Sequence, residues 1–356
     1  MKPSALALAA CTLLAGTAVH AQSSVTIGGY ADASIGAVDN TVGTLNNLPA
    51  GKTSRVDSGS GKASRLNFRG QEDLGGGMKA TFMLDQGFGI DAGTVSTVSG
   101  SNSGFNRGAW LGLSTGMGEL RLGRMLTAYD ALRGSLNQVD DASFAATGTV
   151  WGAGATAGQG QLAVGGSDYL ARTNNTLYYR TPSQLGPFVA SLSVALDEDS
   201  STETASPRTV TAHAEYTLGN ARLGFAQQNE RYTTGTNRFS LLGLAYKLPA
   251  GRIVANLQRQ TDSRVSGGQR SNEFQLGVDW AFTPTVMGYL GYASAATENA
   301  AGQTVVDAAG LGAMVKYVFS KRTNAYLGWR KVTVDRMGGS TAAQQTRYGV
   351  GLTHVF

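Results

Sequence analysis

The sequence predicts an all-β fold, a transmembrane antiparallel β-barrel of about 16 strands with short turns at one end and longer loops at the other. Apolar and polar side chains alternate through most of the chain after Val25. Turn signals recur at regular intervals. The N-terminal 21 residues have the character of an export signal. Together these three observations favour a barrel in a membrane beyond the cytoplasm.

The N-terminal segment combines a positive charge, an apolar stretch and a small-residue cleavage site. Lys2 supplies the charge, and the cleavage site ends at Ala21. We therefore expect residues 1–21 to be removed as a signal peptide and residues 22–356 to form the barrel. The alternative is a lipoprotein signal, in which Cys11 would be acylated and retained.

The composition excludes several other classes of protein. Hydrophobic residues make up 42% and charged residues 15% of the 356 residues, with a net charge of +5, whereas a disordered chain needs low hydrophobicity and high charge. Past the N-terminal segment, no apolar run reaches the roughly 18 residues that a membrane helix needs. Cys11 is the only cysteine, so an exported chain would have no disulfide to brace it.

Alternation defines the expected strands and their two faces. The clearest strand spans residues 273–280, and residues 78–85, 188–194 and 309–317 repeat its pattern. In the first of these, one face carries Phe274, Leu276, Val278 and Trp280, and the other carries Glu273, Gln275 and Asp279.

Seven turn signals, near residues 75, 116, 183, 219, 250, 284 and 321, divide the strands. Most intervals fit two strands of about ten residues, the length that crosses a membrane at a tilt, plus one loop. Eight hairpins joined by seven turns give 16 strands. One interval is about 30 residues longer than the others, and its structureless part is expected from Leu126 to Leu170. We interpret this part as a loop folded inward, and the alternative is a loop that extends outward.

Aromatic residues recur just before the turns. Tyr246, Trp280 and His354 stand at the same spacing from a preceding glycine, and such a ring is typical of barrels in bilayers. A soluble sandwich would also alternate. The export signal, the unequal loops and the end of the chain at Phe356 inside its last strand favour a closed barrel.

Several segments resemble the general trimeric porins of Gram-negative outer membranes, most closely the anion-preferring branch of β-proteobacteria. They are residues 23–30, residues 64–75, Leu122-Gly123-Arg124 and residues 351–356. The resemblance extends over the whole mature chain. It implies a 16-stranded barrel in outer-membrane lipid, short periplasmic turns, a homotrimer and a third loop that narrows the pore. It also implies that a terminal strand ending in Phe356 is recognised by the barrel-assembly machinery.

In that family, arginines on the barrel wall face acidic groups on the infolded loop. The resemblance places the basic wall on Arg65, Arg124 and Arg172, and the acidic side on Asp140 and Asp141. The sequence departs from enterobacterial members at two points. Tyr30 stands where they have a lysine, and their Pro-Glu-Phe-Gly-Gly-Asp loop motif is absent.

Alternation supports part of this assignment independently. Arg65 lies on the same face as Arg69, and Arg180 lies on the polar face of its strand, so all three should line the lumen. The reason is that an arginine on the lipid face costs about 2–4 kcal/mol near the membrane centre. Arg124 instead has the parity of Leu122, so it needs a bulge or a strand end to turn inward.

These features predict passive diffusion of small hydrophilic solutes, anionic and neutral, with anion preference. A substrate-specific channel for organic anions or phosphate is an alternative. An outer-membrane barrel enzyme is a second alternative, but only His213 and His354 remain after the signal segment, and no catalytic motif accompanies them. We expect no cofactor and no metal site, because the usual ligands are missing. We also expect no nucleic-acid partner, because the arginines are dispersed.

Overall fold

The structure is a computed structural model, and it describes residues 24–42, 50–96, 104–137, 143–148, 150–151, 169–196, 208–264, 267–336 and 340–356. The described strands are β1 (Ser24–Val42), β2 (Gly51–Ser58), β3 (Arg65–Gly75), β4 (Met78–Gly89), β5 (Thr94–Val95), β6 (Gly108–Thr115), β7 (Gly118–Leu126), β8 (Arg172–Arg180), β9 (Phe188–Ala195), β10 (Arg208–Leu218), β11 (Ala221–Arg231), β12 (Thr236–Leu248), β13 (Gly251–Asp262), β14 (Gln269–Ala281), β15 (Val286–Asn299), β16 (Thr304–Val318), β17 (Thr323–Arg336) and β18 (Ser340–Val355). An α-helix, α2 (Ala128–Ser135), and a short 3₁₀ helix, η2 (Ser183–Leu185), complete the described elements.

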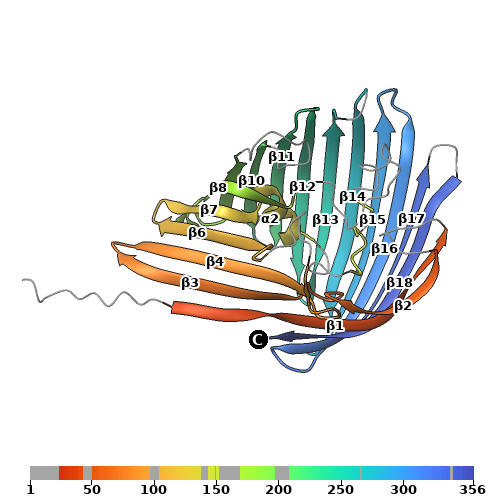
Figure 1. Cartoon of the computed structure of the whole chain (residues 1–356), viewed down its shortest axis with the longest axis horizontal. Helices are drawn as coiled ribbons and strands as arrows, with labels where there is room; N and C mark the ends of the chain where they lie inside the picture. The colour runs from red at the N-terminus through yellow and green to blue at the C-terminus, as the bar shows by residue number, and fades with distance from the viewer. Residues whose placement is uncertain are drawn as a thin grey trace, which may run out of the picture.

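The strands close into one antiparallel barrel. Each strand pairs with the next around the wall, and β1 pairs with β18 over most of its length, from Tyr30 opposite Val355 to Val42 opposite Gln344. In Figure 1, β1 in red lies beside β18 in blue. β2 pairs with residues 33–40 of β1 and β3 with residues 24–30, so the two form one wall strand. Among the described strands, the two-residue β5 pairs only with β4, while β4 pairs with β6 in the wall, so the 18 labelled strands make 16 wall strands. The predicted barrel of 16 strands is therefore confirmed.

All seven predicted turns are present and lie at one end, called here the short-turn end. The opposite end, the loop end, differs from the expectation in one respect. Strands β12 to β18 are 12 to 16 residues long rather than about ten. Their pairing continues past the membrane span, so the β11–β12 connection is reduced to residues 232–235.

The barrel is apolar outside and polar inside. On β14, Glu273 and Gln275 are 3% and 2% exposed, whereas Leu276 is 46% exposed. The same inversion repeats on neighbouring strands, where Leu257 and Leu290 are exposed. Among the described residues, no helix is long and apolar enough to cross a membrane. A closed sheet with its backbone groups paired and its leucines outward is the arrangement that hydrocarbon requires.

An exposed aromatic girdle surrounds the short-turn end. Its members are Tyr179, Phe188, Tyr216, Tyr246, Trp280, Phe282, Tyr317, Phe319 and Phe356. His354 is also exposed there and bonds through Nδ1 to the hydroxyl of Thr323 at 2.9 Å. Amphipathic rings settle at the headgroup level of a bilayer, so the girdle marks one membrane boundary.

The described parts of the long segment after β7 lie inside the barrel, as predicted, and the outward alternative is wrong. The expectation that it lacks regular structure is also wrong, because α2 occupies residues 128–135. The side chain of Thr127 caps this helix by accepting a hydrogen bond from the backbone N–H of Asp130. The helix contacts the inner faces of β9 to β12.

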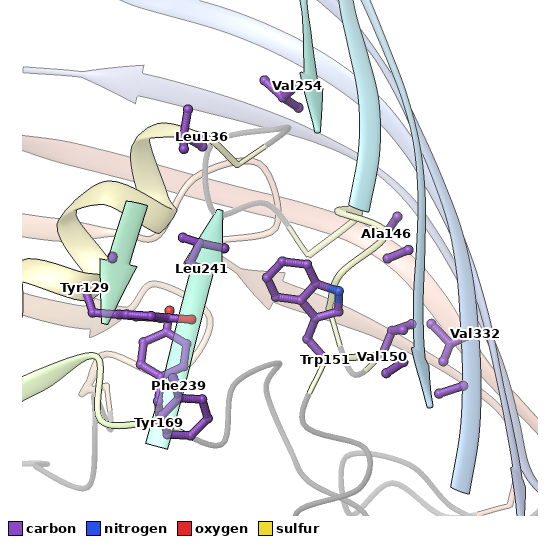
Figure 2. Close-up of a cluster of buried hydrophobic side chains, with 14 of the residues drawn as sticks. Tyr129, Leu136, Ala146, Val150, Trp151, Tyr169, Phe239, Leu241, Val254 and Val332 are labelled. Atoms are coloured by element: carbon purple, nitrogen blue, oxygen red, sulfur yellow. The ribbon is translucent and has the colours of Figure 1, made fainter. Parts of the chain in front are cut away.

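The infolded segment packs on an apolar patch of the inner wall, which is the main hydrophobic core. Figure 2 shows Tyr129 and Tyr169 packed around Phe239, their rings at steep angles to one another, and Val150 and Ala146 beside Val332. Glycines on the wall make room for this packing. A Cβ at Gly224 or Gly243 would meet the side chains of Leu132 and Leu136, respectively. The inner wall is thus built to receive the segment.

Candidate pore constriction

The start of α2 is held by hydroxyl groups of β9 and β10. The backbone N–H of Ala128 donates to Thr211 Oγ1 at 3.0 Å and to Ser193 Oγ at 3.2 Å. His213 Nδ1 lies 3.0 Å from the carbonyl oxygen of Ala128 and 2.7 Å from Ser191 Oγ. His213 therefore positions the helix, in keeping with a structural rather than a catalytic histidine.

The end of α2 is held by basic and amide side chains of the wall. Arg222 Nη2 donates to the carbonyl of Ser135 at 2.8 Å, and Arg252 Nη2 donates to the carbonyl of Asn137 at 2.8 Å. Asn256 Nδ2 donates to the carbonyl of Leu136 at 3.0 Å. The last carbonyls of a helix carry partial negative charge, so cations stabilise this end.

The return of the segment to the wall is fixed at Tyr169 and Leu170. The hydroxyl of Tyr169 donates to Asp130 Oδ1 at 2.5 Å, and burial, reinforced by Asp130 and opposed by Arg133, raises the pKa of Tyr169 well above its usual value. The hydroxyl therefore stays protonated and remains a donor. Glu230 accepts the backbone N–H of Leu170 at 2.6 Å.

The middle of the segment rests on β16 to β18. Phe144 fills the space above Gly328, and the chain passes directly over Gly312 and Gly310. Trp151 Nε1 donates to the carbonyl of Phe274 at 3.2 Å. The described parts of the infolded segment thus lie against the inner wall from β9 to β18, and the N–H of Ser143 also donates to the carbonyl of Ser60, ahead of β3, at 2.9 Å. We infer that the passage for water runs along the rest of the wall, from β1 to β8, which is called here the uncovered wall.

On that uncovered wall, two cations stack on one aromatic ring. The guanidinium carbon of Arg65 lies 4.6 Å from the centroid of the Tyr30 ring, and Lys62 Nζ lies 4.8 Å from it. Tyr30 and Arg65 are directly opposite each other in the β1–β3 ladder. Tyr30 thus holds two positive charges at the lumen face.

Arg107 extends the basic surface beyond Arg65. It is buried beside Asp85, with 3.5 Å between Nε and Oδ2, and its side chain runs alongside Gly87, the ladder partner of Arg65. A side chain at position 87 would crowd it, so the glycine lets the two arginines approach.

Arg124 and Arg172 meet at the turn that leads into β6. Arg124 Nε donates to the carbonyl of Asn106 at 2.8 Å, and Arg172 Nε donates to the carbonyl of Arg107 at 2.9 Å. The β7–β8 register shifts here, and Asn175 has φ +46°. Despite this shift, Arg124 and Arg172 do not share the face of the buried Met125 and Thr173 but alternate with them along their strands. They are brought together with Arg107 rather than stacked against Arg65.

A second basic group lies where β17, β18 and β2 meet. Arg330 and Arg347 are ladder partners, and Arg347 Nη2 bonds Asp57 Oδ2 at 2.7 Å. Arg55 also pairs with Asp57. Arg330 is buried against the infolded segment at Gly148 and bonds Gln345 Oε1 at 3.0 Å.

The remaining expected site residues lie away from the arginines described above. Arg69 and Arg180 have the parity of the buried Asn67 and Tyr178, so they lie on the lumen face as expected, towards the short-turn end. The N–H and carbonyl of Phe356 bond the backbone of Gly29. Asp140 and Asp141 lie outside the described residues.

The acidic groups on the uncovered wall are held by ion pairs or, in the case of Asp32, by hydrogen bonds. Asp57 and Asp85 pair with arginines, and Glu119 pairs with Arg121 at 2.6 Å. Asp32 accepts hydrogen bonds from two backbone N–H groups and from the hydroxyls of Tyr326 and Thr353. By contrast, Arg65 and Arg69 have no carboxylate partner in the described part of the chain. The passage therefore presents net positive charge.

Sequence reasoning missed Arg55, Arg107, Arg330 and Arg347. Alternation could have found Arg347, because it shares the parity of Gln345 and Gly349 against the apolar Tyr348 and Val350. Arg107 gave no such signal, because it precedes β6 and points inward through the turn. Among the described residues, no three His, Cys, Asp or Glu side chains gather as metal ligands would.

Comparison with known proteins identifies the same architecture. A family model described as Gram-negative porin matches residues 5–337. Outer membrane porin protein 32 of Delftia acidovorans is 35% identical over 303 residues, which are 78% of this chain and 75% of that protein. Major outer membrane protein P.IB of Neisseria gonorrhoeae is 27% identical over 86% of this chain and 88% of its own length. The solved anion-selective porin from Comamonas acidovorans superposes with a TM-score of 0.75 and 25% identity, covering 94% of this chain and 100% of that chain.

Proposed function

Because the chain belongs to the Gram-negative porin family, and is therefore a channel integral to the outer membrane, we propose that it lets small hydrophilic solutes diffuse passively with a preference for anions. The observation that carries the proposal is the charge of the uncovered wall. Arg65 stacks on Tyr30 without a carboxylate partner in the described residues, while the acids around it are paired. The solved relative whose title calls it anion-selective supports the same preference.

The mechanism needs no chemical step. A barrel of this size leaves a water-filled lumen, and the infolded segment narrows it. Fixed guanidinium groups lower the energy of an entering anion and raise that of a cation. Because these groups face water, an anion is attracted without being trapped. Neutral hydrophilic solutes pass by size, and apolar solutes are disfavoured because they must displace ordered water.

Within this proposal, the predicted residues have different roles. Arg65, supported by Lys62 and Tyr30, faces the permeating ion. Arg124 and Arg172 act indirectly, by holding the turn that carries Arg107. Asp140 and Asp141 would supply the opposing acidic side.

Reconstitution into liposomes tests the channel directly. Swelling rates with uncharged sugars of increasing mass should fall steadily, as expected for sieving by a water-filled pore. A rate that saturates at low concentration for one organic anion or for phosphate would instead indicate a substrate-specific channel. Liposomes that stay impermeable to every solute, with protein confirmed in the bilayer, would overturn the proposal.

We also propose a homotrimer whose chains are exported after cleavage behind Ala21 and inserted by the barrel-assembly machinery through the strand that ends at Phe356. The family supports this, as does the position of Phe356, which is exposed beside β1 at the seam of the barrel. The molar mass of the purified, detergent-corrected complex tests the trimer. A Phe356→Ala variant should accumulate unfolded in cells if the terminal residue is read during insertion.

A further inference from the structure

The outer surface of β10 to β14 changes character abruptly towards the loop end. One row of laterally paired, outward positions is apolar: Ala214, Phe225, Leu242, Leu257 and Phe274. The next row towards the loop end is Ala212, Gln227, Ser240, Arg259 and Asn272. This boundary between apolar and polar rows runs across five neighbouring strands.

Five arginines lie beyond or on this boundary, and they are called here the arginine band: Arg208, Arg231, Arg238, Arg259 and Arg270. Each has the parity of exposed apolar residues of its strand, as Arg259 has with Leu257. The acids of the same strands, such as Glu230, Asp262 and Glu273, are buried on the lumen side. The outer face here is therefore positive.

The band lies at a constant height above the aromatic girdle. Arg208 precedes Tyr216 by eight residues, Arg238 precedes Tyr246 by eight, and Arg270 precedes Trp280 by ten. At about 3.3 Å per residue and a tilt of about 40°, that is a rise of roughly 20–25 Å. The apolar band of an outer-membrane barrel is about 25 Å tall. The arginines thus stand at the headgroup level of the other leaflet, the one on the loop side.

Four of the five positive charges of the band have no acidic partner among the described residues. Arg208 and Arg231 are directly opposite each other in the β10–β11 ladder, an arrangement that is unfavourable for like charges. None of Arg208, Arg231, Arg238 and Arg259 pairs with a carboxylate in the described residues, whereas Arg270 bonds Glu298 at 2.8 Å. An anion from outside the chain would relieve this repulsion.

The arginines gather on one side of the barrel. At the matching outward positions of β16 and β17, Asp307 and Asp335 are ladder partners, and one cation, Lys331, is exposed nearby. Towards the loop end of β1 and β2, the exposed Lys52 stands opposite Asp39. A band on one side indicates recognition of something specific rather than a uniform polar rim.

We propose that the arginine band binds the phosphate groups of phosphorylated glycolipids in the outer leaflet. The guanidinium fork matches phosphate oxygens and stays charged at any working pH. The apolar row of Phe225, Leu242 and Leu257 immediately below would contact the acyl chains of the same lipid. A lipid satisfies both halves of the surface at once, whereas a soluble phosphate would satisfy only the arginines.

The test compares the wild-type protein with a variant that carries Arg208→Gln, Arg231→Gln, Arg238→Gln and Arg259→Gln. Native mass spectrometry of both, titrated with bis-phosphorylated lipid A and with its dephosphorylated form, counts the lipid bound. We expect wild type to prefer the phosphorylated form, and each removed charge to weaken binding by about fivefold. Inorganic phosphate at millimolar concentration should not displace the lipid.

A matched variant with Gln227→Ala and Asn272→Ala, at the same level, should bind as wild type does. Because the band faces away from the lumen, conductance should be unchanged in the arginine variant, which also shows that it has folded. Should the fourfold variant fail to insert, Arg259→Gln alone is to show the fivefold loss. Equal binding of phosphorylated and dephosphorylated lipid, or undiminished binding by the arginine variants, would overturn the proposal.

Discussion

At the scale of single residues, function depends on where a guanidinium points and what neutralises it. The inner wall carries many arginines, but most have partners: Asp57 for Arg55 and Arg347, Asp279 for Arg252, and helix carbonyls for Arg222. An ion-paired arginine contributes little to the field in the pore. Arg65 differs because an aromatic face, rather than a carboxylate, holds it in place, so its full charge reaches the water.

Replacing Arg65 with glutamine should therefore lower anion preference. One unit charge about 10 Å from an ion in water contributes about 0.4 kcal/mol. Its loss acts in opposite directions on an anion and on a cation, so the anion-to-cation permeability ratio should fall about fourfold. Reversal potentials in a salt gradient measure this ratio. Arg259→Gln, which removes the same charge from the outer face, is the control and should leave the ratio unchanged. Equal ratios for all three proteins would show that Arg65 does not face the ion.

At the scale of elements, the infolded segment is a docked part of the wall. Serine and threonine hydroxyls hold the start of α2, and Arg222 and Arg252 hold its end. Glycines on β11, β12, β16 and β17 leave the space in which Leu132, Leu136 and Phe144 are seated. The described part of the segment should therefore be rigid, and the pore should have one dominant conductance.

A side chain at position 328 should displace this segment. A Cβ there would overlap the ring of Phe144, so Gly328→Val should push Phe144 away from β17 and widen the passage. Single-channel recordings should show a larger conductance with more frequent fluctuations. Gly134→Ala is the control, because a Cβ at that position in α2 meets no atom within 4 Å. A Gly328→Val channel identical to wild type would mean that the docked segment does not set the conductance.

The strands could be predicted from the sequence more fully than the infolded segment could. Alternation alone located β14 and both of its faces, because one residue in two must meet lipid. Helix α2 was not predicted, since its apolar residues Tyr129, Leu132 and Leu136 find partners about 100 residues away on β12 and β13. The role of Arg107 could not be predicted for the same reason. The turn that points it inward is held by Arg124 and Arg172, which come from other strands.

At the scale of the whole molecule, the exterior is stable only in hydrocarbon. The exposed leucines between the aromatic girdle and the arginine band form a belt about as tall as a membrane core. Phosphorylated lipid at one margin and aromatic rings at the other would fix the depth of the barrel.

A charge placed in the middle of this belt should be costly. Leu242 is exposed at the centre of β12, four residues from Tyr246 of the girdle and four from Arg238 of the band, and Leu242→Arg should reduce the free energy of unfolding in lipid by about 2–4 kcal/mol. Reversible urea titration in lipid vesicles, followed by tryptophan fluorescence, measures the change. Leu242→Met controls for altered shape and should cost much less. If Leu242→Arg had the stability of wild type, this surface would not contact hydrocarbon.

The most direct test of a positively charged, water-filled pore is the reversal potential of the purified wild-type protein in a planar bilayer that separates two concentrations of potassium chloride. The account predicts discrete conductance steps and a potential whose sign shows chloride to be the more permeant ion. A potential of the opposite sign, or a bilayer that contains the protein and stays insulating, would contradict it.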